Sequence, residues 1–314
     1  MILVLRALGI GDLLAAVPAL RGIRAAFPAR TLALAAPAWL VPLIDLIGGF
    51  DRVVPADGLA PKPWTIEPPG LAINLHGRGP ESHRLLTAVR PARLWAFANA
   101  DAGHLDGPAW TEEEHEVQRW CRLLYHYGVA ADRADLSLAV PPPAAPAGLT
   151  IVHPGAKAPS RRWPAARFAA VARTLAERGH RVVVTGSAGE RDIAVRVARD
   201  AGLPMRSVLA GRTAVGELAA LVAHARLLIS GDTGIAHLAT AYRTPSVVLF
   251  GPMSPERWGP PGRPYHRAIW HGAVAERGDA PGGPIHPALL LIGVDEVLAA
   301  AGDVERARHA VAAQ

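Results

Sequence analysis

Short apolar runs alternate with amphipathic stretches along the whole chain. Each run is too short for a buried helix and is bounded by glycine, proline or polar residues, as strands are. Continuous apolar strands between helical segments are typical of a parallel sheet that helices cover on both faces. The predicted strands lie at residues 2–5, 32–35, 52–54, 71–75 and 94–97 in the first half, and at residues 149–152, 181–185, 227–229 and 246–250 in the second.

A proline-rich segment, residues 141–148, separates two halves that start in the same way. Consecutive prolines are incompatible with a helix or a central strand, so this segment is a linker. In each half the first strand leads through a loop into a helix, expected over residues 12–26 and 164–178. We therefore expect an α/β protein of two doubly wound, Rossmann-like domains facing a central cleft, with the ligand at the carboxyl ends of the strands.

The linker sets the expected domain boundaries. We place the first domain at residues 1–143 and the second at residues 149–290. Residues 291–314 form a C-terminal tail, helical from residue 294 to 313, that could pack back across the first domain.

Net charge, the distribution of arginines and the cysteine count limit the classes of partner and site that this chain can have. The formal charge is +6 and the pI about 10.2, which suits an acidic partner such as a nucleotide diphosphate. The arginines are scattered, without the aromatic-interleaved basic stripe of nucleic-acid binders, so we expect no nucleic-acid partner. The single cysteine, Cys121, excludes a disulfide framework and a cysteine-based zinc site.

The apolar N-terminus is not expected to be a signal peptide, because Arg6 and Asp12 interrupt it. No later stretch reaches 18 uninterrupted apolar residues, the length that a membrane span needs. We expect a cytoplasmic protein without a transmembrane span, which leaves peripheral membrane association open.

The most informative stretch is the glycine-rich turn of residues 229–238, which joins a buried strand to a helix expected over residues 235–242. Unpaired amides and the helix dipole at such a turn favour an anion. Asp232 would repel a phosphate if it pointed inward, so we expect it to orient the loop or to accept hydroxyl protons. His237 lies one turn into the helix and could face the ligand. The alternative interpretations are an ordinary α/β turn, and an aspartic protease motif, which fails because no second such triplet is present.

The loop after the first strand carries the second candidate, Asp12. As a dinucleotide fingerprint it fits badly, because Leu14 replaces the third glycine and no acidic residue ends the second strand. An aspartate at a helix start, at the carboxyl edge of a sheet, is well placed as a general base. The alternative is that Asp12 is only the N-cap of the helix.

Charged loops follow other strands at the same expected edge. Lys157, Arg161 and Arg162 lie at the mouth of the helix over residues 164–178, where arginines could neutralise a leaving diphosphate. A solvated basic loop is the alternative. Glu190, after the next strand, could accept hydrogen bonds from ribose hydroxyls.

Together these motifs resemble glycosyltransferase family 9, the ADP-heptose:lipopolysaccharide heptosyltransferase group. The resemblance covers residues 2–258 and rests on the order of several short pieces. The matching pieces are Gly11-Asp12, Pro18-Ala-Leu20, His153-Pro-Gly155, Arg162-Trp-Pro164, Ala210-Gly-Arg-Thr213, Gly231-Asp-Thr-Gly-Ile-Ala-His237 and Phe250-Gly-Pro252.

The resemblance implies a GT-B fold and an inverting transfer from an ADP-sugar, as co-substrate, to a carbohydrate-type acceptor, without metal or other cofactor. Asp12 matches the base and Arg161 takes the place of the usual lysine near the donor phosphates. Lys157 departs from the small hydroxyl residue of many members, and Met253 from a common threonine. The implied donor-site residues are Lys157, Arg161, Arg162, Glu190, Gly211, Thr213, Asp232, Thr233, Gly234 and His237. The implied acceptor-side residues are Gly11, His76, Arg78, Ser82 and His83.

Other functions stay open on the residues alone. A nucleotide-sugar epimerase of the same fold would need further acid and base groups, for which His76 and His83 are the only hints. A non-catalytic nucleotide-sugar-binding protein would not need Asp12 and the cation loop. A nicotinamide oxidoreductase is disfavoured by the poor fingerprint.

Overall fold

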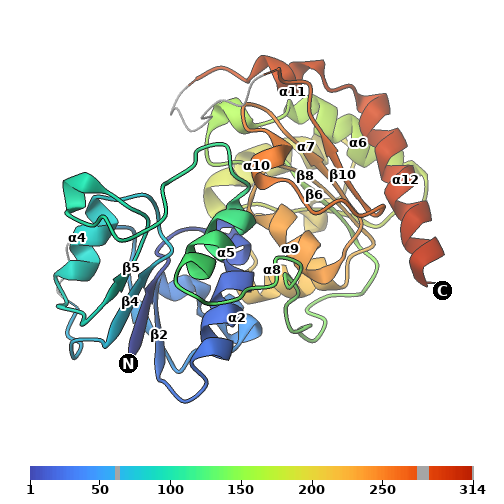
Figure 1. Cartoon of the computed structure of the whole chain (residues 1–314). Coiled ribbons are helices and arrows are strands. Elements are labelled where there is room, and N and C mark those ends of the chain that lie inside the picture. The colour runs from blue at the N-terminus through green and yellow to red at the C-terminus, as the bar shows by residue number, and fades with distance from the viewer. Residues whose placement is uncertain (61–63, 274–282, 313–314) are drawn as a thin grey trace. The chain divides into compact units, whose positions relative to one another are not determined.

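Two parallel sheets organise the chain, one in each half (Figure 1). The computed structural model describes residues 1–60, 64–273 and 283–312. The chain divides into two units, Met1–Ala139 and Val140–Gln314, so the division falls at the start of the proline-rich segment. The last two residues of the expected tail, 313 and 314, lie outside the described residues.

The first unit has a five-stranded sheet in the order β3-β2-β1-β4-β5. All its strand pairs are parallel, and the central strands are buried. The strands are β1 Ile2–Leu5, β2 Leu32–Ala36, β3 Arg52–Pro55, β4 Leu71–Asn74 and β5 Leu94–Trp95. The helices are α1 Ile10–Ala15, α2 Val17–Ala26, α3 Val41–Ile47, α4 Glu81–Thr87 and α5 Glu116–His126, with short 3-10 turns at Ala38–Leu40 and Ala100–Ala102.

The second unit repeats the design with the strand order β10-β9-β8-β6-β7. Its strands are β6 Thr150–His153, β7 Val182–Val184, β8 Leu227–Gly231, β9 Ser246–Leu249 and β10 His266–Ile269. Its helices are α6 Ala165–Glu177, α7 Arg191–Asp200, α8 Val215–Ala223, α9 Gly234–Tyr242, α10 Pro255–Trp258, α11 Pro287–Leu291 and α12 Val294–Ala312. The 3-10 turns are Pro159–Arg161, Ala188–Glu190 and Met205–Ser207.

The helix expected over residues 12–26 is two helices, α1 and α2, that break at Ala16. The amide of Ala16 donates to the carbonyl of Leu13 at 3.1 Å, which tightens the end of α1. Pro18 has no amide hydrogen and suits the first turn of α2. The break keeps α1 as a separate short helix at the carboxyl edge of the first sheet.

The C-terminal helix α12 packs on the second unit. It contacts α6, β9 and β10, and Figure 1 shows it (red) beside α6. Val297, Ala301 and Val304 are buried in the same core as Trp163 and Phe168. This apolar face lies against the second sheet because burial there stabilises the helix.

No helix among the described residues is long and apolar enough to cross a membrane.

Candidate functional site

The first sheet changes winding direction between β1 and β4, and the residues after these strands form one stretch of its carboxyl edge. Leu5 at the end of β1 lies in register with Asn74 at the end of β4. Ligands of open α/β sheets bind at such a switch point. Asp12 and His76 follow these two strands, so the predicted acceptor side of the first unit lies there.

Asp12 lies in the first turn of α1, directly after Gly11, and its side chain is 33% exposed. Gly9, with an extended backbone, is the N-cap of this helix. The alternative that Asp12 serves as the N-cap is therefore wrong. Its carboxylate is partly open to solvent, as the general base of a transfer reaction has to be.

Arg6, which belongs to none of the sequence motifs, lies directly behind Asp12. Its side chain is 0% exposed. Its Nε and Nη2 donate to the carbonyl oxygen of Asp12 at 2.9 and 2.7 Å, and its Nη1 donates to the carbonyl of Leu75. Nη2 also lies 3.7 Å from the Asp12 carboxylate. The signal in the sequence is an arginine at the end of an otherwise apolar strand.

A carboxylate from α5 completes the surroundings of Arg6. Glu116 accepts from Arg6 Nη2 at 3.2 Å, from the indole of Trp120 at 2.9 Å, and from Arg119. The guanidinium of Arg6 lies 4.6 Å from the centre of the Trp120 ring. Buried charges persist only when they are paired and hydrogen-bonded, and this cluster meets that condition.

The loop after β4 is supported from inside by two of the predicted acceptor-side residues. Ser82 and His83 are buried. The side-chain amide of Asn74 donates to Ser82 Oγ at 2.9 Å and to His83 Nδ1 at 3.2 Å, so His83 Nε2 donates to the carbonyl of Phe97 at 2.8 Å. Burial lowers the pKa of His83. These contacts give Ser82 and His83 a structural role in the loop.

His76 and Arg78 lie in the same loop nearer to solvent. The amide of His76 donates to Asn74 Oδ1 at 3.0 Å. Burial, together with the charge of Arg6, lowers the pKa of His76 to about 4, so its ring is neutral at pH 7. Arg78 is exposed and pairs with Glu112 at 3.1 Å.

The second sheet has its switch point between β6 and β8, where His153 lies in register with Ser230. The loop after β6 carries Arg161, and the turn after β8 carries Asp232. Arg161 Nη2 donates to the Asp232 carbonyl at 2.7 Å and to its Oδ2 at 2.6 Å. The Arg161 side chain is 21% exposed and that of Asp232 only 7%. Asp232 thus holds Arg161, a contact that the sequence did not suggest, and its two expected roles, orienting its loop or accepting hydroxyl protons, stay predictions.

The turn after β8 leads directly into α9, whose N-cap is Thr233 and whose first residue is Gly234. In the described part of the chain the Thr233 side chain does not cap the helix, and its hydroxyl donates to the Gly231 carbonyl at 3.5 Å. The Thr233 side chain thus does not occupy the first amides of α9, and amides at a helix start favour an anion. His237 lies one turn further, with its ring 5.9 Å from that of Trp258.

The other two cations of the β6 loop differ from Arg161. Lys157 is exposed. Arg162 is partly buried, and its Nε donates to the carbonyl of Ala156 at 2.9 Å, which closes the loop on itself.

Glu190 holds the loop after β7. Its Oε2 accepts from the amide and hydroxyl of Ser187 at 2.7 and 2.8 Å, and a Cβ at Gly155 would collide with its carboxylate. Gly211 has φ +71°, and its amide donates to the Gly186 carbonyl at 2.9 Å. Glu190 and Gly211 therefore join the loops of this edge, and Thr213 lies two residues on, partly exposed.

His153 is buried beneath this edge. Its Nδ1 lies 2.9 Å from the hydroxyl of Thr185. Burial lowers the pKa of His153, and the charge of Glu190 opposes that shift in part.

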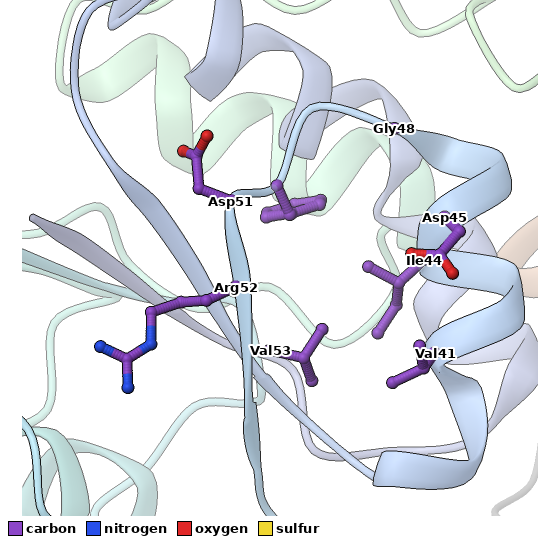
Figure 2. Close-up of a pocket in the computed structure, with 8 residues that line it drawn as sticks. Val41, Ile44, Asp45, Gly48, Asp51, Arg52 and Val53 are labelled. Carbon is purple, nitrogen blue, oxygen red and sulfur yellow. The ribbon is translucent and has the colours of Figure 1, made fainter.

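A cavity of about 400 Å³ lies elsewhere in the first unit, between α3 and the edge strand β3 (Figure 2). Val41, Ile44 and Val53 face one another across it, while Arg52 extends to the other side of the strand. Asp51 at its rim accepts from Leu32 N at 2.8 Å and from Arg24 at 2.6 Å. Among the residues described there, none belongs to the predicted site.

Within the residues that the structure places, no three histidine, cysteine, aspartate or glutamate side chains gather as they would around a metal ion.

Comparison with known proteins gives a family for this chain. The family model described as glycosyltransferase family 9 (heptosyltransferase) matches residues 108–276. Lipopolysaccharide heptosyltransferase 2 of Salmonella typhimurium is 24% identical over 309 residues, which cover 81% of this chain and 84% of the relative. Lipopolysaccharide heptosyltransferase 3 of Escherichia coli is 36% identical over 112 residues, and the match spans only 33% of that relative's length and 35% of this chain.

A solved structure agrees with the fold. The structure of the E. coli ADP-heptose lipopolysaccharide heptosyltransferase II superposes with a TM-score of 0.78 over 98% of this chain and 99% of the other, at 21% identity. A likeness at that identity shows the fold, which is the GT-B fold of two Rossmann-like domains expected from the sequence.

Proposed function

Because the chain belongs to glycosyltransferase family 9, a family of sugar-transferring enzymes, we propose that it moves a heptose from ADP-heptose to a hydroxyl of a lipopolysaccharide-type acceptor. One observation carries the proposal. Each sheet has a partly exposed charged group, held by a buried partner, at its switch point: Asp12 in the first and Arg161 in the second.

The donor side rests on the chemistry of a diphosphate. Arg161 and the first amides of α9 supply the donors that a diphosphate needs, and Asp232 holds Arg161 in place. Relatives named for ADP-heptose and for heptosyl transfer support the choice of adenine nucleotide and sugar.

The reaction we propose is a single displacement. Asp12 takes the proton of the acceptor hydroxyl, and the hydroxyl oxygen forms a bond to the anomeric carbon. The bond from that carbon to the diphosphate oxygen breaks, and ADP leaves with the electron pair. Attack from the face opposite the leaving group inverts the anomeric centre. Arg161 neutralises the charge that develops on ADP.

The acceptor side is proposed to comprise Gly11, His76 and Arg78, with Ser82 and His83 supporting the loop from inside. We place the reaction in the cytoplasm, where a glycolipid acceptor would bring the enzyme to the membrane surface.

The test is incubation with ADP-heptose, with and without lipopolysaccharide truncated before its heptoses, while ADP release and the product are followed. We expect ADP release that depends on the acceptor, and a product heavier by one heptose. Conversion of the sugar to its epimer without ADP release would assign an epimerase instead. Binding of ADP-heptose without either reaction would assign a non-catalytic binding protein.

A further inference from the structure

The guanidinium of Arg6 is fully buried, which is uncommon for an arginine, and it donates hydrogen bonds to Asp12, the residue proposed as the base. Charged side chains are almost never fully buried unless they are paired. Two of the hydrogen bonds of Arg6 end on one atom, the carbonyl oxygen of Asp12, at 2.9 and 2.7 Å. A third ends on the carbonyl of Leu75, directly after the neighbouring strand β4. Arg6 thus fixes the backbone that carries Asp12 to the edge of the sheet.

The Asp12 carbonyl lies where the helix is interrupted. The amide of Ala16 donates to Leu13, and α2 begins at Val17. A carbonyl at the end of a short helix needs a partner from outside the helix. The planar fork of Arg6 supplies two donors in fixed geometry, which an ammonium group does not.

Two carboxylates lie near the guanidinium of Arg6, those of Glu116 and Asp12. Glu116 accepts from both Arg6 and Arg119, so one carboxylate lies between two guanidinium groups. The second negative charge near Arg6 is Asp12, whose Oδ1 lies 3.7 Å from Nη2. The buried guanidinium thus lies directly behind a partly exposed carboxylate, the group that accepts the proton in the proposed reaction.

We propose that Arg6 is a positioning residue that acts through Asp12. It holds the α1 backbone and directs the carboxylate toward the acceptor hydroxyl, without touching the substrate itself. This inference rests on the proposed function, because it needs Asp12 to be the base.

The test is a double-mutant cycle between Arg6→Lys and Asp12→Asn, assayed by acceptor-dependent ADP release from ADP-heptose. Arg6→Lys keeps the charge and removes the fork. A base displaced by a fraction of an ångström loses much of its effect, so we expect kcat to fall roughly 10- to 100-fold while KM for ADP-heptose stays within about twofold. In the Asp12→Asn background, Arg6→Lys should change kcat by less than about twofold, because the group it positions is already absent.

Arg119→Lys is the matched control. Arg119 is also buried, bonds the same Glu116 and lies over an indole, that of Trp110. Within the described part of the chain, its hydrogen bonds run to Glu116 and to the carbonyls of Thr111, Glu112 and Glu114, and not to Asp12. We expect its melting temperature to fall about as much as that of Arg6→Lys, with kcat within about twofold of wild type.

Several outcomes would overturn the inference. Losses that multiply in the double variant, or an equal fall of kcat in Arg119→Lys, would make Arg6 a structural residue only. Arg6→Gln, which keeps one planar donor, replaces Arg6→Lys if the latter does not fold, and failure of both to fold would also assign Arg6 to the core. Near-normal kcat in Asp12→Asn alone would instead remove the proposed base, a result distinct from multiplying losses.

Discussion

The two units each pair an arginine that follows their first strand with an aspartate near a helix start, but the burial of the partners is reversed. In the first unit Arg6 is 0% exposed and Asp12 is 33% exposed. In the second unit Arg161 is 21% exposed and Asp232 is 7% exposed. The same two residue types thus present a carboxylate at one switch point and a guanidinium at the other.

The difference supports the proposal that Asp12 and Arg161 are the members of the two pairs that meet the substrates. A buried ion pair gains little stability over an apolar replacement, so its value lies in fixing a geometry. The buried partner holds the partly exposed one, which is the member of each pair that lies nearer to solvent. Arg6 therefore holds Asp12 in place, whereas Asp232 holds Arg161 in place.

Asp12→Asn should produce the largest effect, because it removes the proton acceptor from the first pair. Positioned general-base catalysis contributes roughly 10²- to 10⁴-fold, so we expect kcat to fall by that factor. Steady-state kinetics of ADP release measures it. Since Gly9 and not Asp12 is the N-cap of α1, the melting temperature should change little.

The affinity for ADP serves as the control for Asp12→Asn. Titration calorimetry should give wild-type affinity, because the substitution lies in the first unit and the donor residues lie in the second. A variant with normal kcat would show that the exposed member of the first pair has no catalytic role.

Arg161→Ala should have the next largest effect. It removes the exposed cation of the second pair and leaves Asp232 without that cation beside the diphosphate. We expect ADP to bind about tenfold more weakly or worse, the scale of one charge-assisted contact. Arg173→Ala is matched for charge, since Arg173 lies on α6 and donates to the carbonyl of Asp200, and it should bind ADP normally. Equal affinities in the two variants would contradict the phosphate role.

Asp232→Asn decides what the buried partner does. Removing its charge would strengthen ADP binding if Asp232 only repelled the diphosphate. If it orients Arg161, the variant loses the 2.6 Å ion pair but keeps the 2.7 Å bond to the backbone carbonyl. We then expect binding about three- to tenfold weaker. Calorimetry gives the sign, and tighter binding would refute the orienting role.

Much of the fold follows from the sequence because buried parallel strands are continuous apolar runs. The predicted runs coincide with β1 to β9 to within a few residues. β10 was missed because His266 and Arg267 make it read as polar, as an edge strand can be. The placement of α12 could not be predicted, because the amphipathic pattern shows which face of a helix is apolar but not which hydrophobic core that face covers.

In the candidate site, the sequence predicts only those residues whose type and place in a loop suggest a chemical role. Asp12 and Arg161 were found as charged groups in loops after strands. The support of Asn74 by Ser82 and His83, and of Asp12 by Arg6, joins residues by contacts across the fold that no local spacing encodes. The family resemblance assigns roles to single residues. Burial, which only the structure gives, separates the residues that solvent can reach from the residues that hold them in place.

His76 should couple stability to pH in the first unit. Its pKa is about 4 in the folded chain and 6.5 when unfolded, so the unfolded chain binds more protons between these values. The free energy of unfolding should therefore fall as the pH is lowered from 6.5 to 4. In His76→Gln, urea unfolding at pH 7 and pH 5 should show a fall smaller by about 1 kcal/mol, allowing for partial exposure. The same pH dependence in both proteins would show that His76 is not buried beside Arg6.

Treatment with a chelator should have the smallest effect, namely none on turnover. The chain has no Asp-x-Asp motif of the kind that holds a divalent ion at a diphosphate. In the second unit the buried carboxylate of Asp232 is paired with Arg161, and the proposed mechanism gives the neutralisation of the leaving diphosphate to that guanidinium. We expect kcat in excess EDTA to equal that in its absence. Activity lost in EDTA and restored by magnesium or manganese would mean that Arg161 does not suffice for the leaving ADP. Such a result would contradict the role proposed for the Arg161–Asp232 pair of the second unit and would not affect the role proposed for the Arg6–Asp12 pair.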